Sequence, residues 1–427
     1  MLNPHITAFW MLIAASSGCA FAEKPPRIIP DQEIAAETET DTSVVPFVFS
    51  SESLGIALGA AAVAHHVGQP QVSLVGFGLY SSNDSWLAYL SGNYLQLASD
   101  SRWLVSTELY QGYSTQAILY LPGNTGYPDE RAGSNESNVK DRIIRVTESN
   151  MARFRFEYIT ELGDGAQGAI NSLYLQPNAG QGWNPAVNGV TILSLAPFLE
   201  SVYIDDYDDP NYIPKAQGVQ FGFKWDNRDS RSRSGSGGQS QFDITYDWGD
   251  SDRPDWLTWE LSQSLFVPLG GNAIAHKQVL ALNAFLGDTP TWNDSWDNPD
   301  GSTGYHRPPY FAGISLGGYQ RLRGYGMNRY HDRSALLYSA EYRLFPRWQP
   351  LHDWPVFNLY NIPWWQWVAF VEAGRVADQM SLSTLHQDMQ WNTGFGARLQ
   401  VEGVVVRAEV AYAPDSSQFW VMVNQPF

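Results

Sequence analysis

This chain of 427 residues carries 44 Asp and Glu side chains against 26 Lys and Arg, a formal net charge of −18 at pH 7, which excludes a nucleic-acid-binding protein. Charged residues make up only 16% and aromatic residues 14%, whereas an ordinary soluble domain has roughly 25% charged residues. No uninterrupted apolar stretch approaches the roughly 20 residues of a transmembrane helix. The remaining class is a closed transmembrane β-barrel, whose alternating strands give few charges and a mean hydropathy near the observed -0.29.

The amino-terminal residues 1–22 are predicted to be a signal peptide. An apolar core runs from Ala8 to Ala15, and Ala20-Phe21-Ala22 has the small-x-small form of a signal-peptidase site. A buried structural helix is the alternative for this segment. Cys19, the only cysteine, is then removed with the signal peptide, or else it is lipidated, although Ser16 stands where a lipoprotein box usually has Leu.

Residues 23–47 are rich in Pro, Glu, Thr and Asp, with little to bury, and are predicted to be a flexible periplasmic lead-in. The barrel is predicted over 48–427. In its segments, apolar and polar residues alternate with period two, as in Trp391, Phe395 and Leu399 against Asn392 and Arg398. A soluble two-sheet sandwich also alternates, but seldom reaches this span in one domain. Sixteen strands are predicted, an even number that leaves both ends on the periplasmic side: 52–66, 70–80, 86–97, 102–113, 150–162, 165–178, 189–204, 215–228, 238–250, 255–268, 275–287, 334–345, 365–376, 391–402, 404–413 and 419–427.

The connection between the eleventh and twelfth predicted strands, 287–333, is long and lies on the extracellular side, and such a loop is usually functional. It contains Arg323-Gly324-Tyr325, and Phe370-Val371-Glu372-Ala373-Gly374 follows about fifty residues later. With Lys224 to Asp229 and the terminal Gln425-Pro426-Phe427, these motifs resemble the BamA/TamA-type superfamily of outer-membrane assembly and translocation barrels, also called the bacterial surface antigen family. Glu372 departs from the Asp that the family usually has.

The resemblance implies that the sixth surface loop folds into the lumen. There Arg323 is expected to bind Glu372 through charge-assisted hydrogen bonds, Gly324 to let the tip turn sharply, and Tyr325 to pack in the lumen. The alternative is a solvated surface arginine of little energetic value. Supporting residues on the lumen face and strand motifs are expected to be Phe370, Gly374, Glu341, Arg343, Asp226 and Arg228.

Phe427 is expected to close a last strand that contains Phe419, Val421 and Val423. This ending resembles the signal by which the outer-membrane assembly machinery recognises its substrates. The resemblance therefore predicts the outer membrane of a Gram-negative bacterium, with outer-membrane lipid, lipopolysaccharide and that machinery as partners.

The function implied is assistance in the insertion or translocation of proteins or lipids across the outer membrane. A weak seam between the first and last strands would serve it, and Gly55 and Gly59 are compatible with weak pairing. The family's periplasmic POTRA domains are not expected here, because 23–47 is too short for one, so a separate periplasmic partner is a possible replacement. A passive channel or structural barrel without insertase activity is the alternative.

Enzymatic activity is not predicted, because the sequence contains no G-x-S-x-G, H-E-x-x-H or P-loop motif. No catalytic residue, cofactor or metal site is expected. The nearest metal-type pairs, His65-His66 and His386-x-Asp388, are interpreted as a strand end and a surface loop. The acidic runs at 205–209 and 294–300 are interpreted as solvated loops, with cation bridging to lipopolysaccharide as the alternative. Trp364-Trp365-x-Trp367 is expected in an interfacial aromatic girdle.

Overall fold

The computed structural model describes residues 27–31, 39–51, 54–174, 182–209, 211–297, 301–355 and 357–427. A single antiparallel sheet of sixteen strands dominates it, and each strand pairs with the next along the chain. Among these residues no helix is both long and apolar enough to cross a membrane. The strands are β1 (Asp41–Ser51), β2 (Gly55–His65), β3 (Ser73–Ser81), β4 (Trp86–Gln96), β5 (Trp103–Leu119), β6 (Ile143–Gly163), β7 (Val190–Ile204), β8 (Lys215–Asp226), β9 (Gly237–Asp247), β10 (Trp256–Gly270), β11 (Ala275–Asp288), β16 (Ser334–Pro346), β17 (Trp365–Ala377), β18 (Gln390–Val401), β19 (Val404–Tyr412) and β20 (Ser417–Val423).

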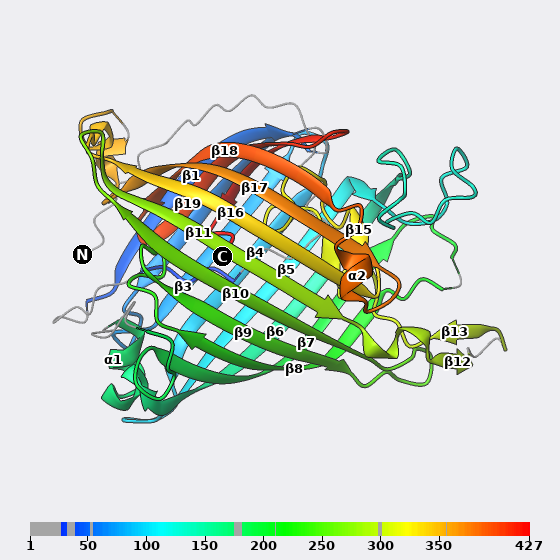
Figure 1. Cartoon of the computed structure of the whole chain (residues 1–427), viewed down its shortest axis with the longest axis horizontal. Coiled ribbons are helices and arrows are strands. Elements are labelled where there is room, and N and C mark those ends of the chain that lie inside the picture. The colour runs from blue at the N-terminus through cyan, green and yellow to red at the C-terminus, as the bar shows by residue number, and fades with distance from the viewer. Residues whose placement is uncertain are drawn as a thin grey trace.

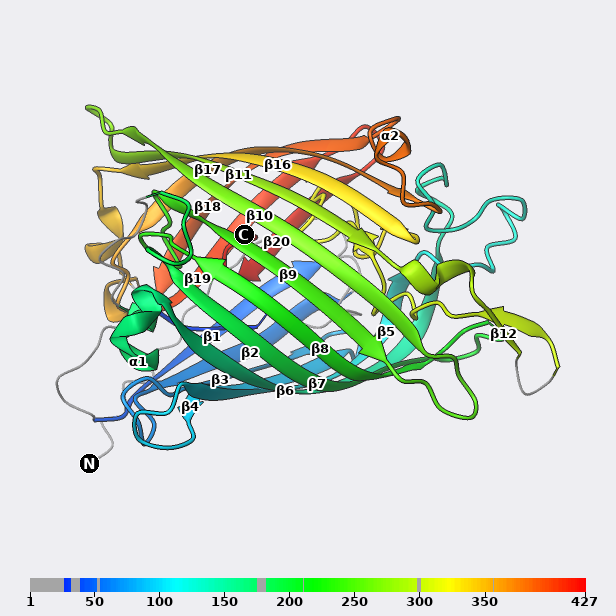
Figure 2. The same ribbon diagram turned by 60° about the horizontal axis from the view of Figure 1, so that its bottom comes forward.

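The sheet curves around an interior in the shape of a tilted barrel (Figures 1 and 2). The alternation predicted for its strands is confirmed, because Trp391 and Phe395 of β18 are 50% and 56% exposed while Asn392 and Arg398 are fully buried. Exposed rings therefore face outward and charged side chains face the lumen. The remaining elements are small: α1 (Ala169–Tyr174), α2 (Leu382–Leu385), four 3-10 turns at 164–167, 290–293, 350–352 and 357–359, and the short strands β12 (Ser295–Asp297), β13 (Thr303–Tyr305), β14 (Ser315–Leu316) and β15 (Tyr330–His331).

The predicted number of sixteen strands is confirmed. It is reached through two opposite errors, one predicted strand that does not form and one strand that was not predicted. The strand predicted at 165–178 does not form, since Gly163 and Gly168 take positive φ angles of 54° and 97° and the chain enters a 3-10 turn and α1 instead. Conversely, β1 lies at 41–51, partly inside the predicted lead-in 23–47. β1 contains Pro46, which is tolerated because β1 is an edge of the sheet, where a missing backbone N–H costs little.

This shift by one strand reverses the direction of every strand from β2 to β6 relative to the prediction. The connection at 120–142 therefore follows the fifth strand rather than the fourth, and lies at the same end as the long loop 289–333. Figure 1 shows both at the end opposite α1. The two loops can therefore contact each other at this end of the barrel, which the sequence analysis predicts to be extracellular.

Inside the barrel, Arg27 to Asp31 are packed rather than extended into solvent. The Arg27 guanidinium donates to Ser106 Oγ at 2.6 Å and to Glu157 Oε2 at 3.0 Å, and Ile28 is 2% exposed. This part of the predicted lead-in is therefore ordered in the lumen. The predicted signal peptide, residues 1–22, lies outside the described residues.

At the other terminus β20 ends at Val423, and the last residues turn into the lumen. Asn424 has a positive φ of 66°. The ring of Phe427 packs 6.4 Å from that of Phe266, and the Arg343 guanidinium lies 5.2 Å from its centroid. The expectation that Phe427 closes the last strand is therefore wrong. The chain turns at Asn424, so the Phe427 ring lies in an apolar pocket of the lumen instead of facing lipid at the end of the strand.

The edges of the sheet, β1 and β20, have no ladder of hydrogen bonds between them within the described part of the chain. Near this seam the contacts run between flanking segments: His65 Nε2 at the end of β2 lies 3.2 Å from Glu402 O in the β18–β19 turn, and Asn424 after β20 donates to Arg27 O at 2.6 Å. The expected role of Gly55 and Gly59 in this seam is wrong, because both belong to β2. A Cβ on Gly59 would lie 2.5 Å from the Phe47 ring, so this glycine allows close packing between β1 and β2.

Candidate functional site: the loop that closes the lumen

The sixth loop returns into the barrel through a small hairpin formed by β14 and β15. Ser315 pairs with His331 and Leu316 with Tyr330, and the tip 317–329 lies between them. Its apolar side chains are buried among strand residues: Leu316, Leu322, Tyr325 and Tyr330 pack with Phe285, Leu337 and Val376. Burial of this apolar surface holds the tip against β11, β16 and β17.

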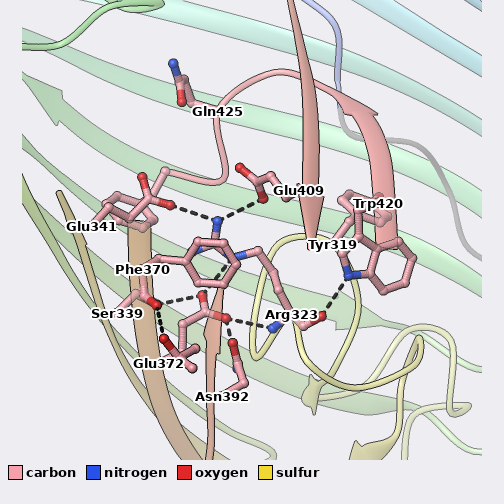
Figure 3. Close-up of polar contacts among 12 residues, drawn as sticks. Tyr319, Arg323, Ser339, Glu341, Phe370, Glu372, Asn392, Glu409, Trp420 and Gln425 are labelled. Atoms are coloured by element: carbon pink, nitrogen blue, oxygen red, sulfur yellow. Dashed lines mark hydrogen bonds and ion pairs between the residues drawn. The ribbon is translucent and has the colours of Figure 1, made fainter. Parts of the chain in front are cut away.

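At the tip, Arg323 is fully buried and ion-paired. Its Nε donates to Glu372 Oε1 at 3.1 Å, its backbone N–H donates to Glu372 Oε2 at 2.6 Å, and its Nη1 lies 2.8 Å from Glu341 Oε1 and 3.0 Å from Glu409 Oε2 (Figure 3). The structure thus brings Arg323 and Glu372 together inside the barrel wall. The other two carboxylates come from β16 and β19.

Glu372 is held in place by its neighbours in the sheet. Ser339 and Asn392 stand in register with it on β16 and β18. Ser339 Oγ donates to Oε1 and Asn392 Nδ2 to Oε2, both at 3.1 Å. Because each neighbouring strand supplies one of these donors, the strands themselves hold the Glu372 carboxylate in the position where it binds Arg323.

Around Arg323 a connected group of charges lines the wall. Arg398 binds both Glu341 and Glu409 at 2.7 and 2.6 Å, Arg343 binds Glu341 at 2.7 Å, and Arg407 binds Glu409 at 2.7 Å. We call these residues, with Arg323 and Glu372, the lumen lock. Every charged group in the lock is at most 1% exposed. Removing one member leaves a buried charge without its partner, which is costly.

Two aromatic side chains complete the environment of Arg323. Its guanidinium lies 3.6 Å from the centroid of the Phe370 ring, and the indole of Trp420 on β20 donates to Arg323 O at 2.7 Å. Burial by itself lowers the pKa of Arg323, but Glu372, Glu409 and Glu341 outweigh it and hold the pKa above its ordinary value. The arginine is therefore charged at any pH at which the barrel is folded.

Gly324 is required by close packing rather than by its turn. It has no positive φ, whereas Gly317 and Gly318 both have φ of 107°. A Cβ at Gly324 would lie 2.5 Å from Asn392 Cβ and 3.1 Å from Ala413 Cβ. The expected sharp turn is present, since the Tyr325 backbone N–H donates to Leu322 O at 3.1 Å across Arg323 and Gly324, but this turn does not need a positive φ at Gly324. Tyr325 packs in the lumen, where its hydroxyl donates to Gln390 Oε1 at 3.3 Å.

Gly324→Val is expected to lower the free energy of unfolding by about 1–3 kcal/mol, since the larger side chain forces the tip away from β18. Urea unfolding of the purified barrel measures this change. Gly76 on β3, which has no positive φ and where a Cβ would meet nothing nearer than 3.7 Å, is the control position for the same substitution. Equal stability of wild type and Gly324→Val would contradict the close approach of the tip to Asn392.

A second set of contacts, which the sequence did not suggest, ties the sixth loop to 120–142. Arg131 forms an ion pair with Asp332, and Arg329 donates to the Ser137 carbonyl oxygen and, at 2.9 Å, to its Oγ. The sequence offers only one indication of these contacts, the group of charged and polar residues from Arg329 to Arg333. Their partners lie about 200 residues away in the chain.

His331 lies between the two loops. Its Nε2 is 2.8 Å from Tyr120 O, and its backbone N–H donates to Gly133 O at 2.8 Å. Burial lowers the pKa of His331, and the hydrogen bond to Tyr120 only partly opposes this effect. The folded protein therefore holds the neutral imidazole.

Because the folded-state pKa lies below the unfolded value of about 6.5, the unfolded chain binds more protons at low pH. The contribution of His331 to stability is expected to be complete above that value and to fall as pH drops through it toward the folded pKa. Urea midpoints at pH 7.5 and 5.0 should therefore differ less for His331→Gln than for wild type. The same pH dependence in both proteins would contradict the buried neutral histidine.

Some of the other predicted site residues lie in or beside the lumen lock, and two lie at the end of β8. Phe370, Glu341 and Arg343 belong to the lock, and a Cβ on Gly374 would lie 2.9 Å from Leu316 Cδ1 of the hairpin. Asp226 and Arg228, by contrast, pair with each other at 2.8 Å at the end of β8. These two supporting residues therefore brace another part of the lumen.

The histidine pairs have ordinary partners. His66 Nδ1 lies 2.6 Å from Pro70 O in the turn after β2, and His386 contacts Tyr338 Oη at 3.0 Å. The described residues contain no group of three or more His, Cys, Asp or Glu side chains arranged for a metal ion. Trp365 and Trp367 lie on the outer part of β17, with ring centroids 5.4 Å apart, and Trp367 is 50% exposed.

Comparison with solved structures identifies the fold. CdiB from Escherichia coli is similar with a TM-score of 0.52 and 12% sequence identity, over 93% of this chain and 66% of that one. BamA from Haemophilus ducreyi lacking POTRA domains 1-3 gives a TM-score of 0.47 and 12% identity, over 91% of this chain and 69% of that one. CdiB from Acinetobacter baumannii gives 0.46 and 11%, over 90% and 64%. The chain thus spans about two thirds of the length of these proteins.

No family model matches the sequence, and no curated protein matches it. The similarity to CdiB from Escherichia coli therefore concerns the fold, which in this chain is all-β with one sixteen-stranded antiparallel sheet. This agrees with the all-β barrel fold class predicted from the sequence. Its outward aromatic and apolar side chains and charged lumen are typical of a transmembrane β-barrel.

Proposed function

We propose that this chain assists the insertion or translocation of proteins or lipids across the outer membrane, with the seam between β1 and β20 as the part of the wall that opens. The observation that carries the proposal is the difference between this seam and the rest of the sheet. Each of the other neighbouring strands is joined by a ladder of about seven or more registered residue pairs, from β19 with β20 to β5 with β6. Between β1 and β20 the described residues form no ladder.

The lumen lock supports the same proposal. It ties β16, β17 and β19 to the sixth loop, and Trp420 extends it to the edge strand β20. A rigid wall on this side confines any opening to the seam, and unpaired strand edges are templates for pairing with another strand. A client strand or a lipid would therefore meet the barrel at β1 or β20.

The test is reconstitution of the purified chain in liposomes with an unfolded client barrel. We expect faster client folding than in protein-free liposomes of the same composition. A variant with Pro substituted for Val421 on β20 is expected to lose this acceleration, because Pro removes a backbone donor from that edge strand; Pro at the outward Phe154 of the central strand β6 is the control for damage to the wall. No acceleration by the intact wild-type protein would contradict the proposal.

A passive channel is the second candidate, favoured by the cavity of about 630 Å³ inside the barrel. In this alternative, client folding is unchanged by the protein and single-channel conductance is present in planar bilayers. Glu260, which binds Arg321 at 3.2 Å at the rim of that cavity, would then influence ion selectivity. The liposome and bilayer measurements together separate the two candidates.

A further inference from the structure

A chamber of about 630 Å³ lies in the lumen beside the lock. The sixth loop bounds it on one side, with Gly317 and Arg321 in its lining, and Arg27 and Phe427 bound it on the other. Its wall is formed by the inward faces of the strands from β5 to β11. A volume of this size lies in the range of small-molecule sites.

Two arginines of β6, Arg153 and Arg155, face this chamber without a partner. In the described part of the chain neither guanidinium makes a hydrogen bond or an ion pair, and the Nε atoms of both are buried without an acceptor. The ring of Phe198 lies 5.5 Å from the Arg153 guanidinium. Elsewhere in the chamber lining, Arg27, Arg228 and Arg321 each bind a carboxylate at 2.8 to 3.2 Å.

The nearby carboxylates do not supply the missing acceptors. Glu157, two residues further along β6, is bound by Arg27. Glu108 stands in register with Arg153 on β5, yet the hydrogen bond it accepts comes from Tyr89 Oη at 3.5 Å. Asp243 accepts from Gln241 at 2.6 Å. The two side chains are half-buried and their Nε atoms are buried without an acceptor, so an anion in the chamber would supply the acceptor that each guanidinium lacks.

We propose that Arg153 and Arg155 bind a phosphate-bearing anion in the lumen. Alternate residues of a strand point to the same face about 6.5–7 Å apart, so the two guanidinium groups can engage different oxygens of one ligand. Each has the planar geometry that matches phosphate oxygens. Two unpaired positive charges are balanced by the charge of about −2 that a phosphate monoester carries near neutral pH.

The test is calorimetric titration of the full chain in a non-ionic detergent with inorganic pyrophosphate, for wild type, Arg153→Gln/Arg155→Gln and Arg145→Gln. Arg145 is the matched control: it lies on the same strand, outside the chamber lining, and donates to the adjacent Ile144 carbonyl. The double variant is expected to bind at least about tenfold more weakly, which corresponds to roughly one lost charge-assisted hydrogen bond. Unchanged affinity, an equal loss in Arg145→Gln, or no binding to wild type at millimolar concentration would overturn the proposal.

Stability without ligand is a second measurement. Because the double variant removes unpaired charges, its urea midpoint in phosphate-free buffer is expected to equal or exceed that of wild type, and added pyrophosphate should raise only the wild-type midpoint. A lower midpoint in phosphate-free buffer would mean that the arginines have structural partners and would overturn the proposal.

Native mass spectrometry of the chain in phosphatidylglycerol nanodiscs identifies the source of the phosphate. Bound phospholipid that is retained by Arg145→Gln and lost from the double variant supports a lipid headgroup as ligand. Pyrophosphate binding without retained lipid supports a soluble phosphate compound. If the wild-type protein binds neither phospholipid nor pyrophosphate, the proposal is overturned. All of these measurements detect binding, so they are independent of whether the barrel accelerates client folding.

Discussion

Arg323→Gln is expected to lower the free energy of unfolding of the barrel by about 3–5 kcal/mol, the largest effect expected of a single substitution in the lumen lock. The substitution leaves Glu372, Glu341 and Glu409, all at most 1% exposed, without the guanidinium that joins them. Arg398, Arg343 and Arg407 remain beside Glu341 and Glu409, so Glu372 bears most of the cost. Urea unfolding monitored by tryptophan fluorescence measures the change.

Arg321→Gln is the matched control, two residues earlier in the same loop. Arg321 binds Glu260 at 3.2 Å, but the two side chains are 30% and 31% exposed, and a partly solvated pair is worth about 0–1 kcal/mol. A double-mutant cycle with Glu372→Gln isolates the coupling to Arg323. Similar losses for Arg321→Gln and Arg323→Gln, or a coupling near zero, would show that the lock contributes no more than a surface pair.

Deletion of residues 318–329 is expected to raise the single-channel conductance of the barrel severalfold. This segment carries Tyr319, Arg323 and Tyr325 into the lumen and bounds the 630 Å³ chamber on the side of the sixth loop. Without it, that chamber connects with the extracellular mouth. Planar-bilayer recording of wild type and the deletion variant measures the difference.

Shortening the β12–β13 hairpin in the same loop provides the control. Ser295 pairs with Tyr305 in this hairpin, which projects away from the barrel (Figure 1) and does not line the chamber. Conductance should remain at the wild-type value in this variant. Equal conductance of wild type and the 318–329 deletion would mean that residues other than the sixth loop close the lumen.

The contacts between 120–142 and the sixth loop add a second closure on the extracellular side. Asp332→Asn leaves Arg131 without its carboxylate, but Arg131 is 52% exposed in this pair, so the expected loss of stability is small. Arg329 is fully buried, at 0% exposure, and His331 is half-buried between the two loops. The closure therefore depends more on these two side chains than on the ion pair between Arg131 and Asp332.

Much of the fold follows from the sequence, because successive side chains of a strand point to opposite faces of the sheet, so the local alternation of apolar and polar residues shows which side chains face outward. The outward rings of β18 and the inward Arg407 and Glu409 of β19 were predictable for this reason. The pair of Arg323 and Glu372 was predictable from motifs. The length of the sixth loop, from Thr289 to Arg333, also indicated a functional segment.

Tertiary structure alone decided which strand is first and where the termini lie. A strand containing Pro46 is stable only because it lies at the edge of the sheet, and Gly163 and Gly168 end β6 only because α1 packs beneath it against Leu104 and Ile159. Phe427 leaves the strand because the lumen offers an apolar pocket beside Phe266. These outcomes depend on contacts between residues far apart in the chain, and a local pattern of alternation carries no information about such contacts. The alternation, the low charge and the many aromatic rings, by contrast, were sufficient to predict a barrel.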